Sequence, residues 1–387
     1  MMQRERCTLG EICRIDSALV DPRDDNYQNL LHVGGANIES RTGRLIDLQT
    51  AKEEKLVSGK FVFDERMVLY SKIRPYLMKV ARPSFKGLCS ADIYPLLPLD
   101  GFVDRGFLFY MLLSEDFTAF AVGGSGRAGM PKVNRDHLFA YTARIPRLDE
   151  QRRVVGILDQ VFEGVAVARA NVEESLRNSR ALFEATVHSA FASSGDVVRK
   201  LGEICSIASP SVDPRKPEFL DLIHVGAANI ESQTGILLGL KTARREGLIS
   251  PKYLFDDSVV LYSKIRPYLM KVARPEFGGL CSADMYPLTP SPQDVNRDYL
   301  FHLLLSKSFT DYAIDGSARA GMPKVNREHL FEFNVQLPTL KKQREISLML
   351  DELRDETQRL AAVYQRKLVA IEALKMSVLH QAFSGHL

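Results

Sequence analysis

The chain has 387 residues, of which 45% are hydrophobic and 26% are charged, and its formal net charge is +3. This is the composition of an ordinary globular protein, long enough for two domains with their own cores. We find no signal pattern at the N-terminus and no apolar stretch approaching the roughly 20 residues that cross a bilayer, so we expect a soluble, cytoplasmic protein without a membrane partner. The mildly basic balance does not by itself indicate a nucleic-acid partner.

The five cysteines exclude two common kinds of site. Cys13 and Cys89 recur as Cys205 and Cys281, while Cys7 has no counterpart. None forms a C-x-x-C pair, so neither a zinc ribbon nor a thiol redox motif is supported. We expect reduced thiols that are mostly buried.

The sequence repeats itself almost from end to end. The run VLYSKIRPYLMKVARP at 68–83 recurs letter for letter at 260–275, an offset of 192 residues. Further identities at this offset are LGEIC at 9–13 and 201–205, and AGMPKVN at 128–134 and 320–326. A repeat of this length is a whole structural unit rather than one step of a solenoid. Two nearly equal units imply two nearly equal binding faces and a target that is itself twofold.

The first part of each repeat predicts an α/β globule. Short apolar runs bounded by Gly and Pro are typical of strands, and apolar residues at helical spacing predict helices. In chain order we expect strands at 67–73 and 77–81 around a turn at Pro75, a strand at 87–97, an amphipathic helix at 107–122, a glycine-rich loop at 123–130, a short helix capped by Asn134 and a strand at 143–148.

The second part of each repeat predicts one long helix, at about 150–191 and again at about 343–383. Neither segment contains proline. The expected seam of the second helix is Ile346, Leu350, Leu353, Thr357, Leu360, Tyr364, Lys367, Ile371, Leu374 and Val378, with Lys367 the odd member. Such alternating steps of three and four are those of a heptad pattern. A stripe this long needs a partner helix, although each helix could instead pack on its own globule.

Connectivity then predicts the fold. The first helix leaves globule one and reaches globule two, so a second helix that packs on it must run back. We therefore expect two pseudo-twofold-related α/β domains separated by an antiparallel two-helix coiled coil, with segments at 1–149, 150–195, 196–341 and 342–387. Two faces related in this way would meet inverted half-sites on a duplex, one helical turn of about 34–36 Å apart or a multiple of it.

Two basic clusters in each repeat are the candidate contacts to DNA. One lies in the repeated run, where cations alternate with tyrosine and serine and no acid occurs, and Arg82 belongs to it; the other follows the glycine-rich loop. The candidates are Asn37, Ser71, Lys72, Arg74, Tyr76, Lys79, Arg127, Lys132, Asn134 and Arg135 in the first repeat, and Asn229, Ser263, Lys264, Arg266, Tyr268, Lys271, Arg319, Lys324, Asn326 and Arg327 in the second. These residue types suit phosphates and base edges, but basic residues also protect the edges of sheets.

His32 and Asn37 recur as His224 and Asn229. They lie on or just after a predicted strand. We expect a structural role for the histidine, while the asparagine could contact a base.

Apparent catalytic motifs fail on inspection. The sequence from Gly124 to Gly129 reads G-x-G-x-x-G, but Met130 and Pro131 follow it where a dinucleotide site needs a helix. Glu54 lies in an acidic run that the second repeat does not keep. We find no nucleophile, base and orienting group kept by both repeats, and therefore expect no catalytic residue and no metal site.

The arrangement of these motifs resembles the specificity subunit of Type I restriction–modification enzymes. The resemblance rests on the LGEI opening, the LYSKIRPYL run, a globule that ends in GMPKVN, the IPRL sequence at 145–148 and the start of a long helix at Glu150 and Gln151. It covers essentially the whole chain. Each motif alone is weak, whereas their combination is specific.

The resemblance implies a non-catalytic subunit that binds a bipartite site on double-stranded DNA. Each globule would be a target recognition domain that reads one half-site in the major groove, and the helices would act as a ruler for the gap. DNA adenine methyltransferase subunits, expected as a pair, would dock on the chain and use S-adenosylmethionine. Restriction subunits would bring ATP- and Mg-dependent translocation and cleavage, so this chain itself would hold no cofactor.

One departure from the family pattern is informative. Recognition domains in this family often differ from each other, whereas here they are close copies, which predicts a palindromic or nearly palindromic interrupted site. The alternatives are a stand-alone DNA-binding regulator, a nuclease or nucleotide-modifying enzyme with a fused-dimer architecture, and a scaffold that never touches DNA. The recognised base pairs do not follow from the sequence.

Overall fold

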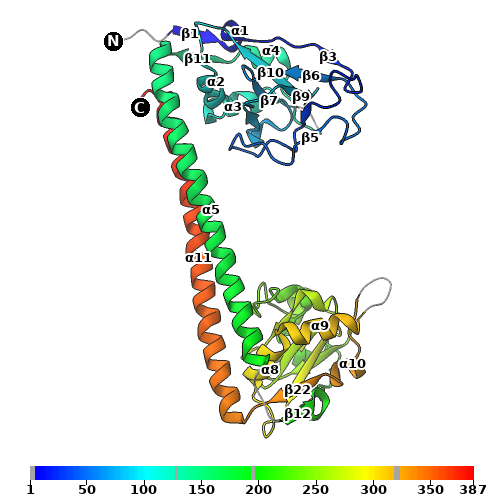
Figure 1. Cartoon of the computed structure of the whole chain (residues 1–387). Coiled ribbons are helices and arrows are strands. Elements are labelled where there is room, and N and C mark those ends of the chain that lie inside the picture. The colour runs from blue at the N-terminus through cyan, green and yellow to red at the C-terminus, as the bar shows by residue number, and fades with distance from the viewer. Residues whose placement is uncertain (1–4, 127–129, 193–196, 318–322) are drawn as a thin grey trace. The chain divides into compact units, whose positions relative to one another are not determined.

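The computed structural model describes residues 5–126, 130–192, 197–317 and 323–387. The chain divides into unit 1, which comprises Met1–Val172 and Arg366–Leu387, and unit 2, which comprises Glu173–Gln365. Each unit holds one α/β domain together with parts of two long helices (Figure 1). These helices are α5 (Leu148–Ala192) and α11 (Leu340–Ser384).

The domain of unit 1 is built on two main sheets. A five-stranded sheet has the order β3-β6-β9-β4-β5, a four-stranded sheet has the order β2-β10-β7-β8, and β1 pairs with β11. The elements are β1 (Glu5–Thr8), α1 (Leu9–Ile12), β2 (Cys13–Ile15), β3 (Leu19–Val20), β4 (Leu31–Val33), β5 (Gln49–Thr50), β6 (Lys60–Phe63), β7 (Val68–Ser71), the 3₁₀ helix η1 (Pro75–Leu77), β8 (Val80–Ala81), β9 (Gly87–Ser90), β10 (Ile93–Pro98), α2 (Arg105–Leu112), α3 (Glu115–Gly123), α4 (Arg135–Phe139) and β11 (Thr142–Ile145).

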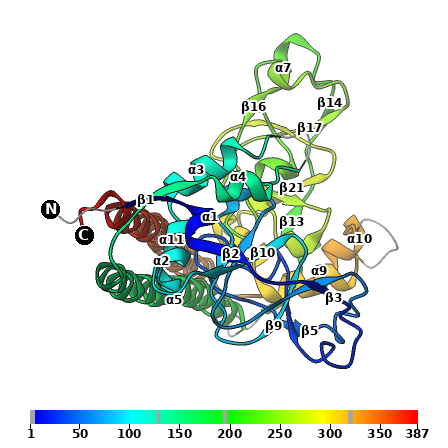
Figure 2. The ribbon, with the colours of Figure 1, turned by 90° about the horizontal axis from the view of Figure 1, so that it is seen from above.

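The domain of unit 2 has the same topology. Its sheets have the orders β14-β17-β20-β15-β16, β13-β21-β18-β19 and β12-β22. The elements are β12 (Val197–Lys200), α6 (Leu201–Ile204), β13 (Cys205–Ser206), β14 (Ser211–Val212), η2 (Pro217–Phe219), β15 (Ile223–Val225), η3 (Ala227–Asn229), β16 (Lys241–Thr242), α7 (Ala243–Glu246), β17 (Lys252–Phe255), β18 (Val260–Ser263), η4 (Pro267–Leu269), β19 (Val272–Ala273), β20 (Gly279–Cys281), β21 (Met285–Pro290), α8 (Arg297–Leu304), α9 (Lys307–Asp315), α10 (Arg327–Phe331) and β22 (Asn334–Leu337). Within it, α7 lies beside β16 (Figure 2).

Strand β7 explains why the repeated run is so apolar. Val68 and Tyr70 belong to the core under α2 and α3, while Leu69 belongs to a second core formed with the five-stranded sheet. Side chains of a strand alternate between its two faces, so β7 is buried on both. The three residues are at most 1% exposed.

Two predicted elements are each split in the structure. The strand expected at 87–97 is β9 and β10, which belong to different sheets because the chain turns at Ala91 and Asp92. The helix expected at 107–122 is α2 and α3, bent by 60°. Ser114 starts the second helix, because its hydroxyl accepts a hydrogen bond from Phe117 N at 3.2 Å.

Among the described residues, this bent pair has the length and composition of a membrane-spanning segment. No single helix is long and apolar enough to cross a membrane, whereas α2 and α3 together pass by length and composition. Their apolar side chains, among them Phe107 and Phe117, lie in the core of unit 1.

The long helices pair in an antiparallel manner, as predicted. In unit 1, Val154 and Leu158 near the start of α5 share a core with Leu379 near the end of α11. In unit 2, Phe191 at the end of α5 shares a core with Leu350 near the start of α11. Each end of the pair also packs on a domain. Because the two helices share these cores, the alternative in which each helix packs alone on its own globule is wrong.

The predicted seam is wrong near the end of α11. Leu374 is 56% exposed, whereas the neighbouring Lys375 is 2% exposed. The ammonium of Lys375 donates to Arg41 O at 3.2 Å, pairs with Glu372 at 2.8 Å and lies 5.7 Å from the ring centre of Phe162 on α5. A long amphipathic side chain can bury its methylene groups and still keep its charge paired.

The thiols are as expected. Cys13, Cys89, Cys205 and Cys281 are buried free thiols. Burial raises the pKa of Cys13 and of Cys205 to about 12. These thiols are therefore poor nucleophiles near neutral pH.

Candidate nucleic-acid interface

The two basic clusters predicted from the sequence lie side by side in unit 1. Beyond the end of β7, Ile73 forms an isolated antiparallel bridge with Lys132. Arg74 N donates to Pro131 O at 2.8 Å, and Val133 N donates to Lys72 O at 2.9 Å. We call the four cations at this junction the basic edge of unit 1: Lys72, Arg74, Lys132 and Arg135.

Arg74 is the most available cation of this edge. It has a left-handed backbone, with φ of 50°, just before the 3₁₀ helix η1. This conformation is unfavourable for a residue with a Cβ. Its side chain is exposed, and its guanidinium has no hydrogen-bond or ion-pair partner among the described residues. Tyr76 follows it on η1 and is 48% exposed.

Lys72 and Lys132 share one acidic neighbour. Their ammonium groups lie 3.5 Å and 3.7 Å from Asp92 Oδ1. Burial lowers the pKa of Lys72, and the nearby charge of Lys132 lowers it further. The side chain of Lys72 is only 12% exposed and lies over the ring of Tyr94, whereas that of Lys132 is 46% exposed.

Unit 2 builds the same edge from Lys264, Arg266, Lys324 and Arg327. Arg266 N donates to Pro323 O at 2.9 Å, Val325 N donates to Lys264 O at 2.9 Å, and φ of Arg266 is 51°. Arg266 is exposed, and Tyr268 is 50% exposed. Burial and then the charge of Lys324 lower the pKa of Lys264.

Other candidates hold the domain together instead of facing outward. Ser71 and Ser263 are 4% and 1% exposed, because they close strands that are buried on both faces. The ammonium groups of Lys79 and Lys271 donate to the carbonyls of Gly35 and Ala227. The long lysine side chains therefore brace a neighbouring loop.

Asn37 and Asn229 use both ends of their amides inside their own loops. Asn37 Oδ1 accepts from Gly34 N at 2.8 Å, and its Nδ2 donates to Ile46 O at 3.1 Å and to Asp47 O at 3.0 Å. Asn229 makes the corresponding three bonds. This geometry supports a structural role in closing the loop.

The predicted helix cap at Asn134 is confirmed. Its side chain accepts from His137 N at 2.7 Å, as that of Asn326 does from His329 N. The neighbouring Arg135 and Arg327 are exposed, and their guanidinium groups lie 5.5 Å and 5.3 Å from the ring centres of Phe139 and Phe331. The candidates Arg127 and Arg319 lie outside the described residues.

The expectation that no nucleophile, base and orienting group recurs in both repeats is wrong as a statement of geometry. His32 Nδ1 lies 3.0 Å from Glu54, and its Nε2 lies 3.1 Å from Ser90 Oγ. His224, Glu246 and Ser282 repeat the arrangement at 2.7 Å and 3.1 Å. The sequence signal was Glu54 itself, which recurs although its neighbours do not.

The structural role of this trio is to tie three segments together. His32 is 4% exposed, and burial lowers its pKa, so the ring is neutral near pH 7. A carboxylate can only accept, so Nδ1 donates to Glu54 and Nε2 accepts from Ser90. The trio thereby anchors residue 54 to β4 and β9.

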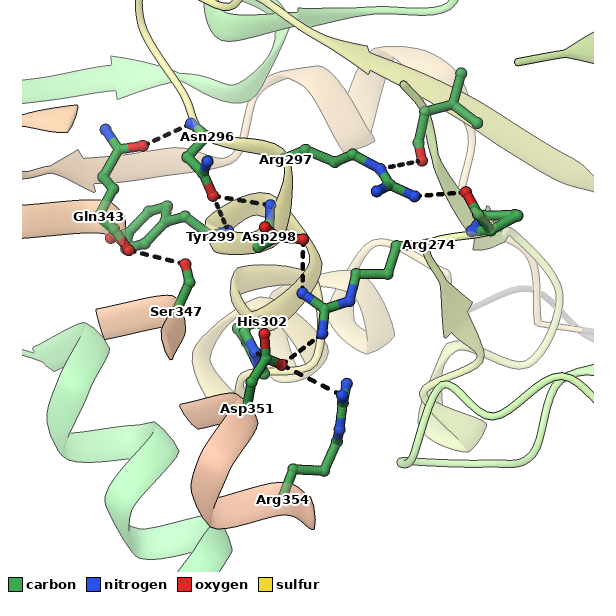
Figure 3. A network of polar contacts seen from close by, with 12 residues as sticks. Arg274, Asn296, Arg297, Asp298, Tyr299, His302, Gln343, Ser347, Asp351 and Arg354 are labelled. Carbon is green, nitrogen blue, oxygen red and sulfur yellow. Dashed lines mark hydrogen bonds and ion pairs between the residues drawn. The ribbon is translucent and has the colours of Figure 1, made fainter. Parts of the chain in front are cut away.

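Arg82 and Arg274 face the long helices and not the basic edge. In unit 2, Arg274 donates to Asp298 at 2.6 Å and to Asp351 of α11 at 2.5 Å, and Arg354 lies 3.4 Å from the same Asp351 (Figure 3). In unit 1, Arg82 and Tyr110 both donate to Asp159 of α5. Sequence reasoning placed these arginines with the other cations because the acids that bind them are distant in the chain.

Asp351 is the centre of the unit 2 network. Burial raises its pKa, but hydrogen bonds from His302 and Arg274 outweigh that effect and lower it to about 2. At the same end of α11, Gln343 is buried and accepts from Asn296 N at 2.7 Å (Figure 3). Gln151 makes the same bond to Asp104 N in unit 1. Each domain is therefore fixed to its long helix by directional bonds.

The part of the chain that the structure describes offers no candidate metal site. No group of three or more His, Cys, Asp or Glu side chains there could hold a metal ion.

The chain is similar to known proteins in both sequence and fold. A family model described as the Type I restriction modification DNA specificity domain matches residues 4–176 and 194–365. The Type I restriction enzyme EcoDI specificity subunit of Escherichia coli is 34% identical over 188 residues, which are 49% of this chain and 41% of that protein. The chain thus matches less than half of the length of this curated relative.

Two solved structures share the fold over nearly the whole chain. One comes from work on complex assembly and conformational transition of the type I R-M system; it covers 99% of this chain and 98% of its own, with a TM-score of 0.79 and 20% identity. The other is the HsdS subunit from Thermoanaerobacter tengcongensis, which covers 99% of this chain and 97% of its own, with a TM-score of 0.59 and 20% identity.

Proposed function

This chain belongs to the Type I restriction–modification DNA specificity family, and from that membership we propose that it is the subunit that reads the DNA sequence for such an enzyme. The observation that carries the proposal is that each repeat matches the family and each brings two separate basic clusters together at one edge. In this proposal the chain binds double-stranded DNA and performs no chemistry itself.

The basic edges are the proposed contacts to DNA. Arg74 and Arg266 are exposed and have no partner among the described residues, and exposed Lys132, Arg135, Lys324 and Arg327 lie beside them. Cations in such a position can replace the counterions of phosphates, while an exposed tyrosine can donate a hydrogen bond to them. Tyr76 and Tyr268 supply that hydroxyl.

Partners would supply the chemistry. We propose that two DNA adenine methyltransferase subunits, which use S-adenosylmethionine, bind this chain in the cytoplasm, and that restriction subunits with ATP and Mg join them in a complete system. The family match supports this assignment in its coarse form, as a DNA-reading member of a multi-subunit enzyme.

The target would be a bipartite and nearly palindromic site. Residues 68–83 and 260–275 are identical and occupy equivalent places in the two domains, so the two edges would make the same contacts on two half-sites. The paired helices α5 and α11 would set the number of base pairs between the half-sites. Inserting equal helical segments into both helices should change that number and leave the half-sites unchanged.

Co-purification and methylome sequencing test the proposal. The tagged full-length chain should capture methyltransferase subunits, which mass analysis would identify. Cells that contain the chain should carry adenine methylation at an interrupted motif, and the motif should vanish when the chain is deleted. Methylation that is unchanged by the deletion would contradict the proposal.

A further inference from the structure

We infer that residues 38–49 and 230–241, which we call the display loops, distinguish the two half-sites from each other; this inference rests on the proposed function. The loops read IESRTGRLIDLQ and IESQTGILLGLK and differ at five positions. The differences are Arg41 with Gln233, Arg44 with Ile236, Ile46 with Leu238, Asp47 with Gly239 and Gln49 with Lys241. The neighbouring run 68–83 has no difference from its mate.

The two display loops have the same backbone although their residues differ. Glu39 N donates to the carbonyl of residue 44 at 2.9 Å, and Glu231 N donates to the carbonyl of residue 236 at 2.9 Å. The φ angles at Arg41 and Gln233 are 66° and 69°. A left-handed backbone is costly for either side chain, so the common frame of the loop enforces it.

Residues that are identical in the two repeats hold this frame. Gly43 and Gly235 have φ of 75°, and a Cβ on either would lie 2.3 Å or 2.5 Å from a ring carbon of Phe109 or Phe301. The loops therefore rest directly on buried aromatic rings. The amides of Asn37 and Asn229 close the loops, and the trios that contain Glu54 and Glu246 anchor the chain that follows.

Four of the five positions that differ face solvent, whereas Ile46 is half-buried. Positions 41, 44, 47 and 49 are exposed in unit 1, and so are their mates in unit 2. Thr42, Gly43, Leu45 and Leu48, which do not differ, are half-buried. The display loops thus combine one rigid frame with two different sets of exposed side chains.

The display loops adjoin the basic edges. Arg41 N donates to Met78 O at 3.1 Å, and Gln233 N donates to Met270 O at 3.2 Å. Met78 is four residues beyond Arg74, so their Cα atoms are at most about 15 Å apart. If Arg74 contacts a phosphate, positions 41 and 44 are within reach of nearby bases. Neutral variation of exposed residues does not account for the differences between the display loops, because exposed Arg74 and Tyr76 are identical in both repeats.

The chemistry of the differing residues indicates what each loop prefers. Arginine pairs with O6 and N7 of guanine through two hydrogen bonds, glutamine pairs with N6 and N7 of adenine, and an aliphatic side chain packs against the methyl group of thymine. Unit 1 presents Arg41 and Arg44 where unit 2 presents Gln233 and Ile236. The unit 1 half-site therefore has G·C base pairs at positions where the unit 2 half-site has A·T pairs.

Exchange of the loop residues tests this assignment. The full complex with its methyltransferase subunits would carry R41Q and R44I, and its bound sites would be selected from random duplexes. We expect wild-type half-sites that match except at one or two positions, and a variant in which these positions in the unit 1 half-site change from G·C to A·T. The reciprocal Q233R and I236R variant should change the other half-site in the opposite direction, which covers the case in which one variant fails to fold.

A matched control replaces two other exposed arginines of unit 1 by their mates. R6V and R14S also remove two positive charges, but at positions outside the display loop. They should leave the selected bases unchanged. Identical wild-type half-sites, or weaker binding by R41Q and R44I without a change of base, would overturn the inference and leave the proposed function standing. A wild-type complex that selects no motif would overturn the proposed function itself.

Discussion

Asp351 on α11 accepts a 2.9 Å hydrogen bond from Nε2 of His302, which is buried on α8. Burial lowers the pKa of His302 below its ordinary 6.5, and the attraction of Asp351 offsets this only in part. Nδ1 of the ring is buried and has no hydrogen-bond partner among the described residues, as suits a neutral ring that donates from Nε2.

This neutral histidine predicts a loss of stability in mild acid. Between its lowered folded pKa and 6.5 the unfolded chain binds more protons, so the free energy of unfolding decreases as the pH falls through 6.5. H302Q keeps a donor for Asp351 and cannot titrate. We expect denaturation measured at pH 7.5 and pH 5.5 to show a smaller pH effect for H302Q than for the wild type. His32 and His224, whose pKa values burial also lowers, contribute to the effect that remains in both proteins.

Asp351 should matter for the attachment of the unit 2 domain to α11. D351N removes the charge that Arg274 and His302 share, and should lower the free energy of unfolding by about 1 to 3 kcal/mol. D355N is the matched control, because the Asp355 side chain is 71% exposed and, among the described residues, pairs only with Arg354, at 3.5 Å. Equal stabilities of the two variants in denaturant titrations would show that the network does not hold the domain.

Gly43 should not tolerate a side chain. G43A combines φ of 75° with a Cβ placed 2.3 Å from a ring carbon of Phe109, so we expect destabilisation of about 1 to 3 kcal/mol. G35A is the control, since nothing lies within 4 Å of its Cβ position and the second repeat has Ala227 there. Thermal unfolding would reveal the contrast, and a G43A protein as stable as G35A would refute the rigid frame of the display loop.

The double variant R74A and R266A should weaken duplex binding without unfolding the chain. Loss of two phosphate contacts should reduce the magnitude of the slope of log K for duplex binding against log salt concentration by about 2. R152A and R344A remove the same charge from exposed positions at the starts of the long helices. Titrations of duplex DNA with the full complex at several salt concentrations measure the slope for both double variants. Equal slopes for the two variants would remove Arg74 and Arg266 from the interface.

Sequence patterns predicted the features that depend on periodicity and local chemistry. The antiparallel helix pair and the cap at Asn134 are confirmed, since a heptad stripe needs a partner and an asparagine side chain can satisfy a free N–H three residues on. The meeting of two basic clusters could not be predicted, because the bridge from Ile73 to Lys132 depends on the tertiary fold.

The same limit explains why the internal partners of two cations in the repeated run were not predicted. Lys79 reaches a carbonyl 44 residues away, and Arg82 reaches a carboxylate 77 residues away. From composition alone, such cations are expected on the surface. In the folded chain, these two instead bind a carbonyl and a carboxylate of the protein. The trio at His32 was missed for a related reason, because Glu54 is joined to it across 22 residues.

Selection of duplexes from a random pool by the assembled complex measures whether the two domains read two related half-sites. We expect two half-sites of nearly inverted sequence at one fixed separation, which differ at one or two base pairs. A single uninterrupted motif, or two unrelated half-sites, would contradict it.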